Sequence, residues 1–299
     1  MAEPDEGREP TMDRVAPDSP EAEEVRAYVE GHEQAAAYHR PAFGRVIARA
    51  AGLSTVLLVA RDEQGAIRGV LPLALTRSLL FGTYATSLPF FNYGGVLADD
   101  RETASRLARA GWSWAEARNA THLVLRHTAD RPLDLPASRR KETVLLDLPS
   151  GDVEALWSDI GSKTRNLVRK ARKADLTART DGAEALPDFH AVYAENMRDL
   201  GTPALGLRFF RVLLEEVGDA ARVHRVLLED RTVAAAVTIG FGGRYEVPWA
   251  AGLREYWDIA NNMLLYWHML EQAVESGADC FDFGRSTPGS GVHRFKKQW

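Results

Sequence analysis

The last five residues of this 299-residue chain, 295–299, place two lysines between aromatic side chains. A fixed cation can stabilise the negative charge that builds on a carbonyl oxygen when an acyl group passes to an amine. We therefore predict that the chemistry lies at Lys296 and Lys297, with Phe295 and Trp299 flanking one of them as packing or stacking surfaces. In a strand, one lysine would face a cleft and the other would face solvent. Two exposed lysines near a chain end are the simpler alternative.

A predicted strand at 280–283 supplies an acid upstream of these lysines. Side chains alternate along a strand, so Phe281 and Phe283 share a packed face and Asp282 points away from them. Asp282 either orients Arg285 or a substrate amine, or it simply pairs with Arg285, and the sequence favours neither interpretation. Asp282 and Arg285 join Lys296 as the predicted catalytic residues.

The segment 284–291 spaces two glycines as a phosphate-binding P-loop does. A P-loop continues with Lys and Ser or Thr and opens a helix. This segment instead runs into His293-Arg-Phe, which we expect to be extended. We therefore predict a flexible hinge beside the site rather than a phosphate loop.

Six cations and no acid occupy residues 163–173. Without local acidic partners on the predicted helix, the run suits an anionic ligand such as a tRNA acceptor arm or a nucleotide diphosphate. A solvated helix face explains it equally well. The predicted phosphate- or tRNA-binding residues are Lys163, Arg165, Arg169, Lys170, Arg172 and Lys173.

The elements that must position these residues fall into two halves. In the first half we expect a helix at 21–40, a hairpin within 53–75, a strand within 81–97, a helix at 101–118 and strands at 122–126 and 143–148. In the second half we expect helices at 153–160, 162–173, 185–200, 207–217 and 261–276, with strands at 176–180, 223–229, 233–241, 245–251 and 280–283. Gly242-Gly243 predicts a tight hairpin, and Pro248 predicts a bulged or splayed strand.

The order strand, hairpin, splayed strand, helix, strand is that of the Gcn5-related N-acyltransferase fold, and it occurs twice. The predicted class is α/β (α+β), with two tandem domains of this type whose mixed, mostly antiparallel sheets are flanked by helices. We place the domains at 19–149 and 150–299, on opposite sides of a cleft that would hold a shared substrate. Ten acids and three arginines in residues 1–30 predict a disordered acidic tail over 1–18.

Coenzyme A binding is not expected. In this fold its pyrophosphate lies on a glycine-rich helix N-terminus. Residues 250–262 contain only Gly252, and the bulky Tyr256 and Trp257 crowd the turn. In the first half, acids at 99, 100 and 102 would repel phosphate.

Composition narrows the class further. The chain is 45% hydrophobic and 26% charged, as in soluble globular proteins, and Cys280 is its only cysteine. With no signal peptide and no apolar run near 18 residues, we expect a cytoplasmic protein whose membrane contact is peripheral at most. The histidines lack metal-ligand spacing, so no metal site is predicted.

The chain resembles the FemAB family of bacterial aminoacyl transferases, and more closely the FemAB-like proteins associated with exosortase/PEP-CTERM systems. The segments that carry the resemblance are residues 88–95, 196–203, 247–250, 262–267, 281–287 and 295–299. The resemblance implies transfer of an amino acid from aminoacyl-tRNA to an amine of a peptidoglycan precursor, without coenzyme A. The Phe-Lys pair that contacts the aminoacyl-tRNA end in related ligases corresponds to Phe295 and Lys296, and their basic Lys-x-Arg-Asn-type segment corresponds to residues 163–169.

Two departures limit this resemblance. The long helical hairpin that some FemAB proteins insert for tRNA is absent, and the exosortase-associated members point to an exopolysaccharide-linked acceptor instead. The family also continues beyond Trp299 into a final strand, which suggests a fragment.

The predicted substrate-binding residues are Phe295, Lys297, His293, Trp249, Asn262, Tyr266, Asn92, Tyr93, His39, Arg40 and Arg198.

The predicted function is therefore aminoacyl or acyl transfer to an amine of a cell-envelope precursor. The precursor is nucleotide-linked or lipid-linked, and the protein is expected to be a monomer or weak dimer. One alternative is an N-acetyltransferase that uses acyl-coenzyme A on a sugar amine. Another is a non-catalytic exopolysaccharide-assembly protein.

Overall fold

The structure, a computed structural model, describes residues 11–129 and 133–299. The chain divides into two compact units, Met1–Pro136 and Ala137–Trp299. Each unit contains a six-stranded sheet in which antiparallel neighbours dominate and one pair of the described strands is parallel. The predicted fold class, two mixed and mostly antiparallel sheets flanked by helices, is confirmed.

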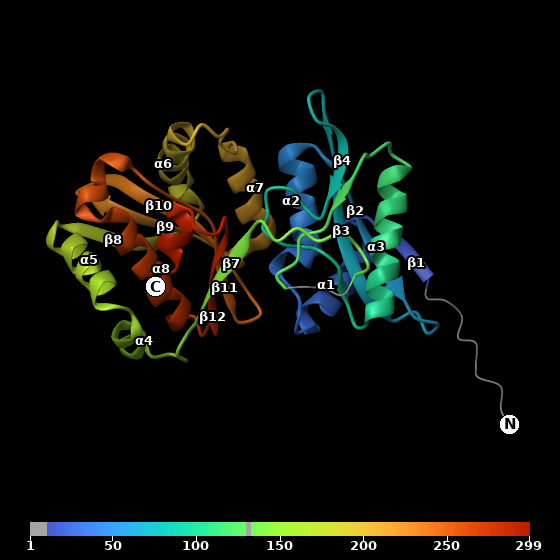
Figure 1. Ribbon diagram of the computed structural model, residues 1–299, viewed down its shortest axis with the longest axis horizontal. Coiled ribbons are helices and arrows are strands. Elements are labelled where there is room, and N and C mark those ends of the chain that lie inside the picture. Colours follow the sequence, from blue (N-terminus) through green and yellow to red (C-terminus); the bar gives the residue numbers. More distant parts are fainter. Residues whose placement is uncertain (1–10, 130–132) are drawn as a thin grey trace. The chain divides into compact units, whose positions relative to one another are not determined.

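The first sheet has the strand order β1-β2-β3-β4-β6, and β5 pairs with β3. The elements of this unit are β1 (Thr11–Val15), α1 (Ala22–Gly31), η1 (Ala37–His39), α2 (Pro41–Ala51), β2 (Ser54–Arg61), β3 (Ile67–Ser78), β4 (Gly82–Thr86), β5 (Leu97–Ala98), α3 (Arg101–Glu116) and β6 (Leu123–Val124). Strands β2 and β3 are apolar on both faces because helices cover both (Figure 1). Leu58 and Leu73 pack with Leu107 and Trp114 of α3, while α1 and α2 pack against the other face.

Three predictions for the first unit need correction. Thr11–Val15 is not part of a disordered tail, because it pairs antiparallel with β2; residues 1–10 lie outside the described part of the chain. The helix predicted at 21–40 ends at Gly31, and a second helix, α2, begins at Pro41, where a proline fits the first turn. Within 81–97 only Gly82–Thr86 and the start of β5 are extended.

The second sheet has the order β7-β12-β11-β10-β9-β8. The elements of this unit are β7 (Glu142–Asp147), α4 (Val153–Asp159), α5 (Ser162–Lys173), β8 (Leu176–Asp181), η2 (Ala183–Ala185), α6 (Leu186–Asp199), α7 (Leu207–Val217), η3 (Gly218–Ala220), β9 (Ala221–Leu228), β10 (Arg231–Phe241), β11 (Arg244–Gly252), η4 (Arg254–Ile259), α8 (Asn261–Glu275), β12 (Cys280–Ser286) and α9 (Gly291–Lys296). Helices α4, α5 and α8 share one core with β11 and β12, and α6 and α7 pack against the sheet with a separate aromatic cluster.

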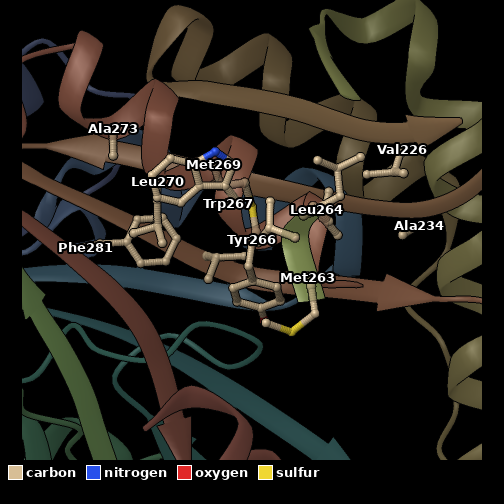
Figure 2. Close-up of a cluster of buried hydrophobic side chains, with 14 of the residues drawn as sticks. Val226, Ala234, Met263, Leu264, Tyr266, Trp267, Met269, Leu270, Ala273 and Phe281 are labelled. Carbon is tan, nitrogen blue, oxygen red and sulfur yellow. The ribbon is translucent and has the colours of Figure 1, made fainter. Parts of the chain in front are cut away.

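Helix α8 forms the centre of the second unit. Its residues Met263, Leu264, Trp267 and Leu270 are buried, as the helical spacing predicted. Figure 2 shows these side chains gathered with Phe281 of β12 and Val226 of β9. A helix that is apolar over most of its surface must be covered on several sides. Helix α8 is accordingly packed between α4, α5 and the strands of the second sheet.

The boundary between the units lies earlier than the predicted 149/150. Strand β7 was expected in the first half, but it pairs antiparallel with β12 and so completes the second sheet. The predicted Gly-Gly hairpin is confirmed: Gly242 and Gly243 have φ of +54° and +74° between β10 and β11. The predicted bulge near Pro248 is also confirmed, because the register of β10 against β11 shifts between the Val237 and Ile239 pairs.

Candidate functional site

The candidate site begins where two parallel strands part. Strands β11 and β12 pair only from Arg244↔Cys280 to Glu246↔Asp282. Just beyond, Val247 and Pro248 form the bulge in β11, and proline cannot donate to a ladder. We call the place where the two strands separate the fork.

The bulge also changes which side chains face each side of the sheet. One extra residue reverses the alternation of a strand. Tyr245 faces the α8 core, whereas Glu246 and Trp249 both lie on the opposite face, although they are three residues apart. Trp249 packs at right angles against Phe210 of α7, with ring centroids 5.3 Å apart, so this predicted substrate-binding residue is a core residue of the α7 side.

Strand β12 has its own irregularity at Gly284. The register against β7 shifts between Asp282 and Arg285, and Gly284 has a φ of +70°. The Gly284 N–H donates to the Asp282 carboxylate over 2.7 Å. Glycine is required here because an L side chain is strained at this φ, and the turn aims the Gly284 carbonyl into the fork.

Residues 291–296 form helix α9, and the prediction of an extended segment at 293–295 is wrong. Ser290 caps the helix by accepting from the His293 N–H over 3.1 Å, a pattern typical of helix starts. The helical turn separates the two lysines: Lys296 is buried and Lys297 is exposed. The prediction that one lysine faces inward and the other faces solvent assumed a strand, whereas the segment is a helix. In that helix, Lys296 is the lysine that faces inward.

The Lys296 ammonium enters the fork. Its Nζ donates to the carbonyl oxygens of Gly284 and Arg285 over 3.0 and 3.2 Å. The side chain is 7% exposed. An ammonium has three N–H groups, so one remains to donate to a further acceptor.

Burial lowers the pKa of Lys296 to about 8. The carboxylates of Asp282 and Glu246 oppose this effect, while the nearby Lys141 adds to it. At neutral pH the lysine is therefore mainly a cation, held close to its titration point by its surroundings.

Asp282 is fully buried and pairs with Arg244, whose guanidinium lies 3.2 Å from the carboxylate. This ion pair crosses from β12 to the start of β11, and the sequence did not suggest it. The prediction that Phe281 and Phe283 share the packed face is confirmed, because both lie in the α8 core. Arg285 is half-buried just after the bulge in β12.

Sequence reasoning missed Glu246, Arg244 and Lys141. Glu246 is 4% exposed and stands opposite Asp282 in the parallel pair. Lys141 donates to the Thr287 hydroxyl over 2.8 Å, which places it near the same loop. A signal was present: Arg244 and Glu246 are alternate charged residues in a strand that is otherwise apolar, which marks a buried polar face.

Aromatic residues close the α8 side of the fork. Tyr266 lies stacked near Phe283 at 5.9 Å and meets the edge of Phe295 at 4.9 Å. Trp299 lies 6.3 Å from the same ring. Burial raises the pKa of the Tyr266 hydroxyl. Tyr266 and Phe295, both predicted to bind substrate, form the packing that holds Lys296 in place.

His293 lies on α9 one turn before Lys296, and Asn262 lies at the far end of β11. The His293 Nδ1 accepts from the Gly289 N–H, and its Nε2 lies 3.3 Å from Glu142 of β7. Asn262 lies against Gly252, where an added Cβ would be 2.1 Å from the Asn262 Oδ1. Its neighbour Asn261 is fully buried and donates to the carbonyls of residues 233 and 253.

Five predicted binding residues remain, one on α6 and four in the first unit. Arg198 is exposed on α6 and pairs with the neighbouring acids Glu195 and Asp199. The other four belong to the first unit, where His39 is buried and bonds the Gly95 carbonyl through Nε2 at 3.0 Å. These four are His39, Arg40, Asn92 and Tyr93.

The basic helix α5 divides into structural and exposed cations. Arg165 donates to the carbonyls of Trp157, Ser158 and Ile160, so it caps the end of α4. Arg172 pairs with Glu271 of α8. The exposed members of the predicted group, beside Arg172, are Lys163, Arg169, Lys170 and Lys173.

The two helix N-termini that could hold a pyrophosphate in this fold are occupied by side chains. Asp100 caps α3 by accepting from the Thr103 N–H over 2.8 Å, and this bond lowers the pKa of the Asp100 carboxyl. At α8, the Asn261 Oδ1 accepts from the Asn262 N–H. Tyr256 and Trp257 form the 3-10 turn η4 just before this helix.

A separate hollow of about 520 Å³ lies at the other end of the second sheet, lined among others by Thr180, Tyr245 and Gln272. Beneath it, His224 is buried and bonded to Thr180 and Thr238. Burial lowers the pKa of His224 to about 3, so it is neutral at physiological pH. Both ring nitrogens of His224 therefore have hydrogen-bond partners within the fold.

The part of the chain that the structure describes comprises residues 11–129 and 133–299. Among these residues, no three His, Cys, Asp or Glu side chains gather in a way that could hold a metal ion. Over the same ranges, no helix combines the length and apolar character that crossing a membrane requires.

Comparison with known proteins supports the fold. Residues 161–297 match the family model described as an acetyltransferase (GNAT) domain. The crystal structure of FemX is similar with a TM-score of 0.72 at 15% identity, covering 96% of this chain and 94% of that one. A tandem GNAT protein from the clavulanic acid biosynthesis pathway is similar with a TM-score of 0.53 at 14% identity, covering 97% and 93%.

A third similar structure is the C-terminal domain of a putative lysylphosphatidylglycerol synthetase from Agrobacterium fabrum, with a TM-score of 0.58 at 15% identity, covering 93% of this chain and 88% of that one. A search of curated proteins finds no match. At these identities the likeness concerns the fold alone. The chain has a tandem GNAT-like fold like that of FemX.

Proposed function

We propose that this protein is a FemAB-like transferase that forms an amide bond by moving an aminoacyl group onto an amine of a cell-envelope precursor. The observation that carries the proposal is the buried Lys296 ammonium in the fork, fixed by the Gly284 and Arg285 carbonyls with one N–H to spare. The FemX-like tandem fold supports it.

In the proposed reaction, the acceptor amine attacks the carbonyl carbon of an aminoacyl ester. A C–N bond forms, the ester C–O bond breaks, the amine loses a proton and the ribose hydroxyl regains one. Negative charge builds on the carbonyl oxygen in between. The free N–H of Lys296 donates to that oxygen, and a preorganised charged donor in a site with little water stabilises the transition state more than the ground state.

The carboxylates beside Lys296 serve this role in two ways. Asp282 and Glu246 keep the lysine charged at neutral pH despite its burial. Arg244 balances Asp282, so the cluster does not carry excess negative charge towards the substrate. Asp282 therefore acts as a positioning residue through Lys296 and Gly284.

Aminoacyl-tRNA is the proposed donor. Of the two helix N-termini that could hold pyrophosphate in coenzyme A-dependent members, that of α3 is capped by the Asp100 carboxylate, which disfavours phosphate there. At α8 the Asn261 Oδ1 already accepts from the Asn262 N–H. The exposed cations of α5 offer sites for tRNA phosphates instead. A reaction with this donor takes place in the cytoplasm, and the acceptor is a peptidoglycan peptide or an exopolysaccharide-linked amine.

The test supplies the purified protein with a pool of radiolabelled aminoacyl-tRNAs and with nucleotide-linked and lipid-linked peptidoglycan precursors. Amide-linked label that survives mild base, and that is absent with Lys296→Met, supports the proposal. Transfer from labelled acetyl-coenzyme A instead would replace it with an N-acetyltransferase. If neither donor gives product or raises the melting temperature, the non-catalytic assembly protein remains.

A further inference from the structure

The turn between β3 and β4 exposes three consecutive large apolar residues. Leu79, Leu80 and Phe81 are 107%, 87% and 74% exposed. The Ser78 hydroxyl accepts from the N–H groups of Leu80 and Phe81, and Gly82 has a φ of +72°. These bonds shape a tight turn whose side chains all point outward. Figure 1 shows the hairpin extending past the ends of α2 and α3.

This tip differs from the other exposed apolar residues of the first unit. Phe90, Trp112, Val124 and Leu135 are each exposed by 52% or less and none adjoins another, and single apolar residues on a surface need no explanation. Three in a row at a convex tip are costly in water, because their full surface is hydrated. A cluster of this kind marks an interaction site.

Charge is distributed unevenly along this sheet. At the hairpin end, Arg77 lies next to the tip, and Arg118 precedes Thr121, whose N–H bonds the Thr83 carbonyl. Arg49 lies in the last turn of α2, shortly before Ser54 begins β2 at the same end of the sheet. Glu116, the last residue of α3, is an acid at this end. Acids are in excess at the opposite end, around the β2–β3 turn and the start of α3, where Asp62, Glu63, Asp99, Asp100 and Glu102 lie. Arg61, Arg68 and Arg101 lie at the same end, and Arg68 pairs with Asp62 and Asp99, so acids outnumber bases there by five to three.

We propose that the 79–81 tip inserts into the interface of an anionic lipid bilayer, with the neighbouring arginines at the headgroups. Leucine and an aromatic ring suit the boundary between headgroups and acyl chains. Arginines close to that boundary are attracted to anionic lipids. The acidic end of the unit then points away from the negative surface.

A bilayer fits this tip better than a protein partner does. A specific protein interface removes about 800 Å² from each partner, and three side chains on a narrow hairpin offer much less. A wedge of this shape needs only a soft apolar layer to enter. The inference concerns the first unit and does not depend on the chemistry proposed for Lys296.

The test is co-sedimentation of the full chain with vesicles of phosphatidylcholine alone or mixed with phosphatidylglycerol, at low and high salt. We expect binding to the mixed vesicles that weakens with salt. The variant Leu79→Ser/Leu80→Ser/Phe81→Ser should bind about tenfold more weakly or worse. The control is Leu200→Ser, which removes a largely exposed leucine (67%) from the second unit and should bind like the unaltered protein.

A second measurement reports insertion directly. A polarity-sensitive dye on Leu80→Cys, in a Cys280→Ser background, should shift its emission to shorter wavelength with the mixed vesicles and be quenched by lipid-borne bromine. The proposal is overturned if the unaltered protein stays in solution, or if the triple variant sediments equally well. It is also overturned if the tip drives self-association without vesicle binding, since that indicates a protein contact. Circular dichroism checks that each variant is folded.

Discussion

The two units contain the same structural element and use it differently. Each has one parallel pair of described strands, β4 with β6 and β11 with β12. In the first unit the strands stay connected beyond their last pair: the Ser87 N–H donates to the Val124 carbonyl over 2.9 Å, and the Ser87 hydroxyl accepts from the Arg126 N–H. In the second unit, β11 and β12 separate after the Glu246–Asp282 pair. The Lys296 ammonium lies in the space between them.

The closing contacts in the first unit are backbone and imidazole groups. The Gly95 N–H donates to the Arg126 carbonyl over 2.7 Å, and the Val96 N–H donates to the His127 Nε2. A Cβ on Gly95 would lie 2.5 Å from His127, so this glycine allows close packing. The comparison teaches that this element becomes a candidate site only where the chain supplies charged groups and leaves them room.

The largest expected effect separates the two lysines of α9. Lys296→Met should lower kcat by roughly 10²–10³-fold, because one preorganised donor to the developing oxyanion is lost. We expect no loss of unfolding free energy at neutral pH, because burying the charged lysine is itself unfavourable and Asp282 keeps its partner Arg244. Lys297→Met is the control, because Lys297 is exposed. Equal rates for both variants in the transfer assay would remove the catalytic distinction between the two lysines.

The pH dependence tests the charge state in the fork. The pKa of Lys296 is about 8 instead of its usual 10.5, so the rate should fall by about tenfold per pH unit above that value. Between pH 8 and pH 10.5, Lys296 is more fully protonated in the unfolded chain than in the folded protein. This lysine therefore makes the free energy of unfolding rise with pH over that interval.

Two measurements check this prediction, a pH–rate profile and urea unfolding across the same interval. Lys296→Arg keeps the charge and should lose the alkaline fall in rate. In Lys296→Met, the free energy of unfolding should no longer show this rise with pH. An alkaline limb that persists in Lys296→Arg would assign the titration to another group, such as the acceptor amine.

The next effect compares a buried ion pair with an exposed one in the same unit. Asp282→Asn leaves Arg244 without its carboxylate and should cost about 3 kcal/mol of unfolding free energy, since Asp282 is fully buried. Glu255→Gln, which breaks the exposed pair with Arg231, should cost less than about 1 kcal/mol. Similar losses in chemical denaturation would show that the fork does not hold its charges away from solvent.

The smallest effect concerns the glycine beside Lys296. Gly284→Ala and Gly289→Ala both place a side chain at positive φ, +70° and +74°, and each should cost about 1–2 kcal/mol. Only Gly284 offers its carbonyl to Lys296. We therefore expect a several-fold lower rate for Gly284→Ala at equal stability, and equal rates would mean that this carbonyl does not position the lysine.

The sequence predicted much of the second unit from local signals. The spacing of apolar residues in 261–276 marked α8, the Gly-Gly pair marked its hairpin, and Pro248 marked the bulge. Alternation placed Phe281 and Phe283 in the core. These features depend on the conformational preferences of neighbouring residues, which a single chain displays directly.

Two features depended on partners distant in sequence, and a third had too short a local signal. Strand β7 was assigned to the wrong unit, because only its pairing with β12 reveals where it belongs. Glu246 and Arg244 became part of the candidate site only when the parallel pairing set them beside Asp282. The terminal segment was predicted as extended because a six-residue helix has too few turns to show periodicity.

By itself, therefore, the sequence determined that this chain has two mixed sheets and that a Phe-Lys pair near its end is the place to look for chemistry. Only the tertiary structure decided which of the two lysines is buried. Lys296 is buried because α9 turns it towards the carbonyls of the β12 bulge, and the carboxylates that oppose the loss of its charge come from β12 (Asp282) and from β11 (Glu246). Burial and charge balance are properties of residues brought together in space, and spacing along the chain does not encode them.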